Sequence, residues 1–269
     1  MSELEIEGIK VHYRETGEGE PVLLLHGGGG SGAQWRGVCK ILAPRFRAIT
    51  MDHYGHGGTD PWPGVPEERT HEAEAVLVRA VMARVGEPVH LVGHSFGGGV
   101  AMRLIVQDAS MVRSLTLIEP QIYSVLQHAG ETAHYRQTHD LATTFIAETR
   151  AGNTEEAWRS FIDSNNPPGT WDSLAEDARA KLLPLTDAIA SCYHANLNHG
   201  TTLAECRAIA LPTLLLYGGS AFPRMRKITE IIAGEITGSR LESIPGAGHM
   251  SPLTHPEMVA DKIANHLTG

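Results

Sequence analysis

A serine, Ser95, lies in the segment Gly-His-Ser-Phe-Gly at residues 93–97. Apolar residues precede the segment, as expected of a buried strand, and residues 97–107 have the pattern of a helix. A Gly-x-Ser-x-Gly segment between a strand and a helix forms a tight turn that presents the serine hydroxyl as a nucleophile. The helix then directs its first N–H groups toward a reacting carbonyl. The flanking elements disfavour the alternative, a glycine-rich turn with an incidental serine.

With this segment, the sequence resembles the α/β-hydrolase superfamily over nearly its whole length. The corresponding superfamily members have a glycine loop after an early strand, and here His26-Gly-Gly-Gly-Gly-Ser follows a strand that ends at residue 25. The resemblance implies that this loop supplies an oxyanion donor, the backbone N–H of Gly28 or of Gly27, beside that of Phe96. One such donor is worth about 3 kcal/mol in the transition state. A phosphate-binding loop is disfavoured, because the Walker Lys-Ser/Thr pair is missing.

A late segment, Pro-Gly-Ala-Gly-His-Met, extends the resemblance and supplies a base, His249. Ser95 precedes His249, as in the hydrolase chain order. We expect His249 to take the proton of Ser95 and return it to the leaving group. His255 is nearby, but it begins the last helix and is expected to be solvated or capping. His26 and His94 flank the two glycine motifs, and we expect them to hold loops by hydrogen bonds.

The acid of the triad is not at the position that the resemblance implies. The loop after the strand at residues 214–217 reads Gly-Gly-Ser-Ala-Phe-Pro, with Ala221 where Asp is expected. No Asp or Glu occurs between residues 206 and 229. Glu119 ends the apolar strand at residues 115–118, and catalytic groups gather at the carboxyl ends of such strands. The sequence therefore predicts Glu119 as the acid.

Two alternatives to this prediction stay open. Glu119 could be an ordinary polar residue at the entrance to the next segment, made rigid by Pro120. The enzyme would then use a dyad, with a backbone carbonyl or a water molecule holding His249. Removing a triad carboxylate typically leaves a weakened but real enzyme.

The elements around these motifs alternate between strands and helices. The expected strands are residues 9–15, 21–25, 46–51, 88–92, 115–118, 214–217 and 241–244, and the expected helices are residues 35–42, 72–85, 97–107, 228–233 and 256–267. This order predicts an α/β fold with a mostly parallel central sheet and helices on both faces. We expect residues 1–120 and 207–269 to form the hydrolase core. Residues 121–206 lack a clear strand and are expected to form an inserted helical cap.

Composition excludes several classes of function. The 269 residues carry a net charge of −9 without a basic run, which argues against nucleic acid as a partner. The three cysteines have no CxxC spacing, so we expect neither a disulfide framework nor a metal site. Asp52, His53 and His56 are close in sequence but lie in a loop with a structural role in the superfamily. We expect no cofactor, no signal peptide, no membrane span and a cytoplasmic location.

A small-molecule substrate is the expected partner, and a homodimer is left open. Gly27 and a set of aromatic residues could form its pocket, although the aromatic residues could equally belong to the core. These aromatic residues are Trp35, Tyr123, Trp158, Trp171 and Phe222. The expected reaction is hydrolysis of a small or medium carboxylic ester or lactone through an acyl-enzyme.

Other reactions on the same scaffold are the alternatives. Epoxide hydrolases and haloalkane dehalogenases use an aspartate nucleophile, so Ser95 argues against them. A carbon–carbon bond hydrolase or a lyase would keep the triad, but no decisive lysine or threonine identifies one. A non-catalytic small-molecule receptor is favoured only by the missing acid at Ala221.

Overall fold

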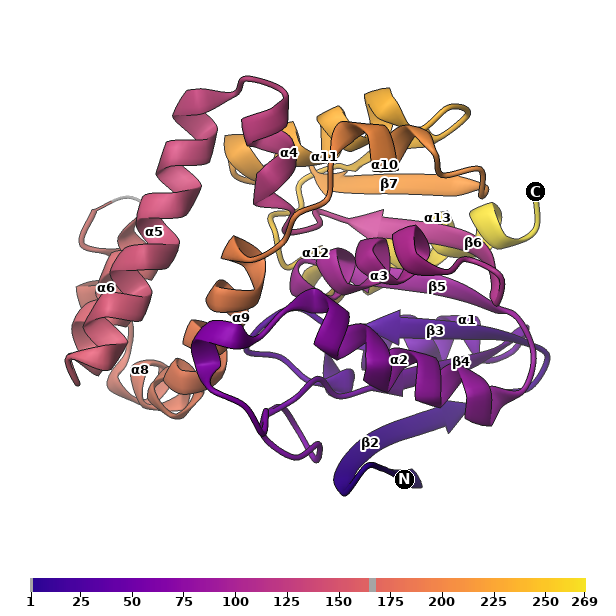
Figure 1. Ribbon diagram of the computed structural model, residues 1–269, viewed down its shortest axis with the longest axis horizontal. Coiled ribbons are helices and arrows are strands. Elements are labelled where there is room, and N and C mark those ends of the chain that lie inside the picture. The colour runs from indigo at the N-terminus through magenta and orange to yellow at the C-terminus, as the bar shows by residue number, and fades with distance from the viewer. Residues whose placement is uncertain (1, 165–167) are drawn as a thin grey trace.

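The computed structural model describes residues 2–164 and 168–269. Its centre is an eight-stranded sheet with the strand order β1-β2-β4-β3-β5-β6-β7-β8 (Figure 1). The strands are β1 (Ser2–Ile6), β2 (Ile9–Thr16), β3 (Glu20–Leu25), β4 (Phe46–Met51), β5 (Val89–His94), β6 (Val112–Ile118), β7 (Thr213–Gly218) and β8 (Arg240–Ile244). The pairs β1–β2 and β2–β4 are antiparallel, and all the others are parallel. The predicted mostly parallel sheet is confirmed.

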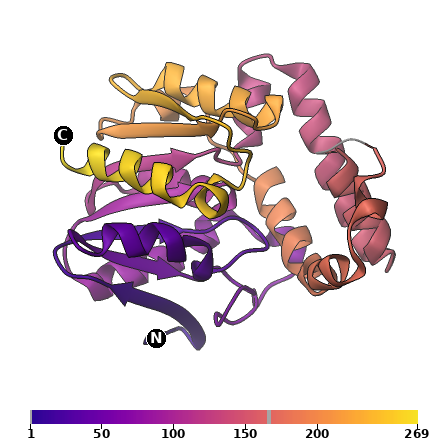
Figure 2. The same cartoon turned by 180° about the vertical axis from the view of Figure 1, so that it is seen from behind.

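Helices cover both faces of this sheet, as the alternation of side chains along β3 requires. Val22 and Leu24 belong to one apolar cluster, and Leu23 and Leu25 belong to the other. The first cluster includes side chains of α1 (Arg36–Leu42) and α13 (Pro256–Leu267), which lie together on the face seen in Figure 2. The second cluster includes side chains of α2 (His71–Val85), α3 (Phe96–Gln107) and α11 (Pro223–Glu235).

The described part of residues 121–206 contains helices and no strand. These helices are α4 (Tyr123–His128), α5 (Thr132–Arg150), α6 (Thr154–Ser164), α7 (Thr170–Ser173), α8 (Glu176–Leu182), η3 (Leu183–Leu185), α9 (Thr186–Leu197) and α10 (Leu203–Arg207). Figure 1 shows α5, α6 and α8 standing to one side of the sheet. That this segment forms a separate cap domain stays a prediction. Among the described residues, no helix combines the length and the apolar character that crossing a membrane requires.

The remaining elements are short helical turns. They are η1 (Gly32–Trp35), η2 (Pro66–Glu68) and α12 (Ser251–Thr254). No strand is expected at residues 2–6 from the sequence, yet β1 pairs with β2 there through a tight hairpin. Glu7 and Gly8, with φ of 49° and 82°, make this turn. The strand was missed because its two apolar residues, Leu4 and Ile6, alternate with acidic ones over only five positions.

Candidate active site

Ser95 lies between the last residue of β5 and the first residue of α3. Its backbone has φ 54° and ψ −117°, a region that residues other than glycine rarely adopt. Two glycines make this turn feasible. A Cβ atom at Gly97 would lie 2.5 Å from the carbonyl oxygen of Leu25, and one at Gly93 would lie 2.5 Å from that of Gly97. The glycines therefore let α3 pack directly against the strands and hold Ser95 at the carboxyl end of β5.

The structure brings the three predicted catalytic side chains together. His249, in the loop between β8 and α12, has its Nε2 atom 3.0 Å from Ser95 Oγ. Its Nδ1 atom lies 2.5 Å from Glu119 Oε2. Ser95 is 7% exposed and Glu119 is fully buried. An imidazole that donates from Nδ1 to a carboxylate leaves Nε2 free to accept the serine proton.

Both carboxylate oxygens of Glu119 accept hydrogen bonds. Oε1 accepts from the backbone N–H of Gly218, the last residue of β7, at 2.6 Å. Glu119 itself has φ 43°, and its own N–H donates to Leu216 O at 3.0 Å. The side chain thus reaches across from β6 to the end of β7. Its carboxylate lies at the carboxyl end of β7. The loop that follows β7 has Ala221 at the position where an acid is expected.

A buried hydrogen-bond chain connects the glycine loop with His249. The N–H of Gly27 donates to Gln34 Oε1 at 3.2 Å, and Gln34 Nε2 lies 3.1 Å from His94 Nδ1. His94 Nε2 lies 2.9 Å from the carbonyl oxygen of His249. Since that oxygen only accepts, His94 carries its proton on Nε2 and accepts from Gln34 through Nδ1. Burial lowers the pKa of His94 to about 3, so the ring is neutral.

His26 holds the same loop from its other side. Its Nδ1 lies 2.7 Å from the carbonyl oxygen of Gly27, and its Nε2 accepts from the backbone N–H of His53 at 3.1 Å. The geometry thus gives both His26 and His94 hydrogen bonds that fix loops. Neither side chain contacts Ser95 Oγ through a hydrogen bond in the described part of the chain.

The geometry favours Gly28 over Gly27 as the second N–H donor. The N–H of Gly27 is already bonded to Gln34. Within residues 2–164 and 168–269, the N–H groups of Gly28 and Phe96 have no hydrogen-bond acceptor, and both residues line the same cavity as Ser95. Phe96 is the first residue of α3, where backbone N–H groups have no partner inside the helix. Both N–H groups are thus available for an oxyanion.

A cavity of about 780 Å³ opens onto Ser95 and His249. Its walls come from the glycine loop, from helices α5, α6 and α9, and from the loop before α11. Four of the predicted pocket residues line it: Gly27, Tyr123, Trp158 and Phe222. The cavity is mostly apolar, which suits a small organic substrate.

Two of the predicted aromatic residues do not reach this cavity. Trp35 is fully buried in the cluster that packs α1 and α13 on the sheet, and its ring contacts His94 edge-on. Trp171 is also fully buried and belongs to the other cluster. The prediction of Trp35 as a pocket residue is therefore wrong, because its side chain packs in the same apolar cluster as Val38 and Leu42 of α1.

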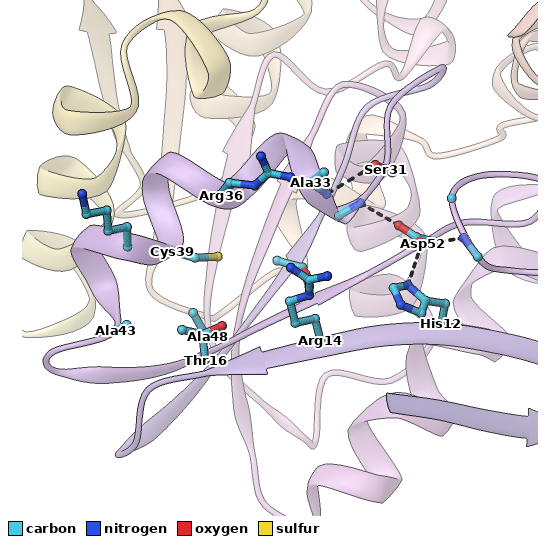
Figure 3. A pocket seen from close by; sticks show the side chains of 15 residues that line it. His12, Arg14, Thr16, Ser31, Ala33, Arg36, Cys39, Ala43, Ala48 and Asp52 are labelled. Carbon is cyan, nitrogen blue, oxygen red and sulfur yellow. Dashed lines mark hydrogen bonds and ion pairs between the residues drawn. The ribbon is translucent and has the colours of Figure 1, made fainter. Parts of the chain in front are cut away.

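A second cavity of about 770 Å³ lies between β2, β4 and α1 (Figure 3). Arg14 and Arg36 line it, and Asp52 lies at its end near His12. Asp52 accepts a hydrogen bond from His12 Nδ1 at 2.8 Å. It also accepts from the backbone N–H groups of Gly32 and Gly58. These bonds fix the loop that follows β4. None of the predicted catalytic residues lines this cavity.

Three polar residues of the site are not predictable from the sequence motifs. Gln34 connects the glycine loop to His94, and Asn196 and Arg224 line the active-site cavity. None of them belongs to a motif. Gln34 lies in a short helical turn, and Asn196 lies in a helix whose apolar face is weakly marked. Arg224 follows the loop that contains Ala221, and no pattern in that loop marks it as a pocket residue.

Among the described residues, seven buried histidines have lowered pKa values, and burial is nearly complete around five of them. Burial lowers the pKa of His94 and of His199 to about 3 and that of His56 to about 4. Burial also lowers the pKa of His26 and His71 well below the ordinary value. His71 and His199 lie against each other, with their Nδ1 atoms 2.6 Å apart. These rings are neutral in the folded protein and take up protons on unfolding in mild acid.

The fold is expected to lose stability as the pH falls below 6.5. The unfolded chain then binds protons that the buried rings do not, so the free energy of unfolding falls by about 1.4 kcal/mol for each such histidine at pH 5.5. Above about pH 7.5 these groups contribute almost no slope, because the histidines of the unfolded chain are then neutral as well. We expect a melting temperature that is nearly flat from pH 8 to 7.5 and drops with increasing slope from pH 7 to 5. His199→Asn should reduce the slope, and the exposed control His128→Asn should not. A flat profile down to pH 5 would contradict the neutral state of these rings.

Comparison with known proteins places this geometry in a family. A model of the alpha/beta hydrolase family matches residues 22–262. A soluble epoxide hydrolase from Corynebacterium sp. (strain C12) is 26% identical over 281 residues, which cover 95% of this chain and 93% of that protein. A 2-hydroxy-6-oxo-6-phenylhexa-2,4-dienoate hydrolase from Comamonas testosteroni is 31% identical over 125 residues, 45% of this chain and 43% of that protein.

Solved structures agree with the fold. The enol-lactonase from Burkholderia xenovorans LB400 has a TM-score of 0.77 at 17% identity, and the alignment covers 100% of both chains. At this identity the likeness bears on the fold alone. The family match spans most of the chain and includes Ser95, Glu119 and His249. This chain therefore belongs to the alpha/beta hydrolase family.

Proposed function

We propose that this protein is a serine hydrolase that cleaves a small or medium carboxylic ester or lactone through an acyl-enzyme. Ser95 is the nucleophile, His249 is the general base and then the general acid, and Glu119 orients His249. The N–H groups of Gly28 and Phe96 form the oxyanion hole. The observation that carries the proposal is the continuous hydrogen-bonded chain from Ser95 Oγ through His249 to Glu119.

In the first half of the reaction, Ser95 Oγ attacks the carbonyl carbon while its proton moves to His249 Nε2. The carbonyl oxygen becomes an oxyanion between the two backbone N–H groups, and the Glu119 carboxylate stabilises the imidazolium. When the intermediate collapses, His249 gives the proton to the alkoxide that leaves. A lactone follows the same steps, except that the released hydroxyl stays attached to the acyl group.

In the second half, a water molecule attacks the acyl-enzyme. His249 Nε2 takes a proton from the water, and the same N–H groups hold the second oxyanion. The collapse breaks the ester to Ser95, which recovers its proton from His249. The products are a carboxylic acid and an alcohol, or one hydroxy acid from a lactone, and no cofactor takes part in these steps.

A carbon–carbon bond hydrolase is the second candidate. It is favoured by the similarity to the 2-hydroxy-6-oxo-6-phenylhexa-2,4-dienoate hydrolase, although the alignment covers less than half of either protein. The similarity to the epoxide hydrolase is longer. Opening an epoxide through an alkyl ester needs a carboxylate nucleophile, and Ser95 does not provide one.

Initial rates on a chain-length series of p-nitrophenyl esters test the proposal. We expect serine-dependent turnover with a maximum at short to medium acyl chains, because the cavity of about 780 Å³ holds a small ligand. The chain length at which kcat/KM falls measures how much of the cavity the acyl group fills. If no ester gives serine-dependent turnover, the esterase proposal fails. The carbon–carbon hydrolase, lyase and receptor alternatives would then be tested next.

A further inference from the structure

Arg224 is a nearly buried cation in the active-site cavity. It is the second residue of α11 and is 5% exposed. Its guanidinium carbon lies 5.1 Å from the centre of the Phe222 ring. Burial lowers the pKa of Arg224, whereas the neighbouring hydroxyl groups of Tyr123 and Tyr193 raise it. The proposed reaction assigns no step to this side chain.

The charges around the cavity all have one sign. Among the described residues that line it, Arg36 and Arg224 are cationic and there is no Asp or Glu. Glu119 lies behind His249 and does not line the cavity. In a largely apolar and partly enclosed space, a fixed positive charge attracts an anionic ligand more strongly than it does in water.

Side chains that can donate hydrogen bonds lie beside Arg224. The hydroxyl groups of Tyr123 and Tyr193 are close enough to affect its pKa, and both residues line the cavity. Asn196 also lines the cavity, and its Nδ2 atom lies 3.4 Å from the hydroxyl of Tyr123. Hydroxyl and amide N–H groups donate to carboxylate oxygens, so these side chains suit an anionic ligand group beside Arg224. We call Tyr123, Tyr193, Asn196 and Arg224 the polar cluster.

The rest of the cavity differs from the polar cluster. Leu141, Trp158, Leu185 and Ile189 line it with apolar surface. A ligand that satisfies both parts has a short hydrocarbon segment and an anionic end. Arginine is suited to carboxylates, because its planar fork donates two parallel hydrogen bonds to the two oxygens.

We propose that Arg224 binds a free carboxylate on the substrate, so that the enzyme prefers esters or lactones that carry a second, unesterified carboxylate. This inference rests on the proposed serine hydrolase function. It narrows the substrate class from carboxylic esters in general to half-esters of dicarboxylic acids and lactones that bear a carboxylate. Arg224 acts in this site as a specificity-determining residue.

Two matched substrates test the inference. Monoethyl glutarate and ethyl 5-methylhexanoate have the same acyl chain, ending in a carboxylate or in an isopropyl group of similar shape. Proton release gives kcat/KM for each, and the ratio cancels any general loss of activity. We expect the wild type to favour monoethyl glutarate and Arg224→Met to lower the ratio by at least about 30-fold. Arg224→Lys, which keeps the charge, should retain part of the preference.

Arg226→Met is the matched control. Arg226 lies two residues further along α11, and its guanidinium donates a hydrogen bond to Glu230 at the surface. It should leave the ratio unchanged. An equal ratio in the wild type and Arg224→Met would overturn the inference. Loss of the preference in Arg36→Met, with Arg224→Met unchanged, would also overturn it.

Binding of glutarate separates this inference from the proposed function. In Ser95→Ala, glutarate should raise the melting temperature, and adding Arg224→Met should abolish the increase. If the wild type hydrolyses neither ester but glutarate binds through Arg224, the hydrolase proposal fails and the carboxylate site stands. If the neutral ester is hydrolysed and glutarate binds equally with and without Arg224, only the carboxylate site fails.

Discussion

Replacing Ser95 by alanine is expected to lower kcat for ester hydrolysis by at least about 10⁴-fold. The substitution removes the atom that forms the acyl-enzyme, and His249 Nε2 loses its partner at 3.0 Å. The oxyanion donors and the cavity stay in place, so the remaining rate measures what they supply without a nucleophile. Because alanine meets the same backbone strain at φ 54°, we expect the melting temperature to change by only a few degrees.

The measurement is kcat for the best p-nitrophenyl ester, together with covalent labelling by a fluorophosphonate. Ser95→Ala should lose both, and the exposed control Ser220→Ala should keep both. Turnover by Ser95→Ala within about tenfold of the wild type would show that another nucleophile operates. Labelling that persists in Ser95→Ala would lead to the same conclusion.

Much of the fold follows from local patterns that allow few alternatives. The strands β3, β5 and β7 are short apolar runs, and the helices between them show a clear period, so the parallel sheet is predictable. The antiparallel β1 was missed because two apolar residues, Leu4 and Ile6, give too short a pattern. The ends of elements were also displaced: β6 begins at Val112, earlier than the apolar run indicated.

The site residues that belong to a recognisable sequence motif were predictable. Ser95 lies between Gly93 and Gly97, because only glycine permits the close approach of strand and helix that its turn requires. The glycine-rich segment of His249 includes Gly246, which has a φ of 74°. Glu119 was identified by an absence, the loop at Ala221 without an acid, combined with a carboxylate at the end of a neighbouring strand. The hydrogen bonds of Glu119 to His249 and Gly218 agree with that interpretation.

The residues that shape the cavity belong to no recognisable sequence motif. Trp35 and Trp158 are the same residue type in helical segments, yet Trp158 lines the cavity and Trp35 lies in the core. Whether each side chain lines the cavity or lies in the core depends on how helices far apart in the sequence pack. Local sequence patterns do not specify that packing. Asn196 and Arg224 line the same cavity although they come from α9 and α11. That two distant segments share one cavity is a property of the tertiary structure alone.

Replacing Glu119 by glutamine is expected to lower kcat by about 10³- to 10⁴-fold, the effect typical of removing a triad carboxylate. Both Glu119 oxygens accept hydrogen bonds, one from His249 Nδ1 and the other from the N–H of Gly218. A glutamine amide has only one oxygen, so its NH₂ group must face one of these donors. If the NH₂ group faces His249, Nδ1 must accept and the ring proton moves to Nε2, which then cannot accept the serine proton. If the NH₂ group faces Gly218, two buried donors point at each other.

The variant Glu119→Asp distinguishes the effect of the carboxylate charge from the effect of side-chain length. The shorter side chain keeps the carboxylate but cannot contact both partners, so we expect a smaller loss than for glutamine. Melting temperatures for both variants identify any loss of folded protein, and kcat is then compared at equal folded concentration. If Glu119→Gln stays folded and keeps kcat within tenfold of the wild type, His249 does not depend on Glu119. The hydrolase would then work as a Ser95–His249 dyad, with His249 held through its carbonyl oxygen by His94 at 2.9 Å.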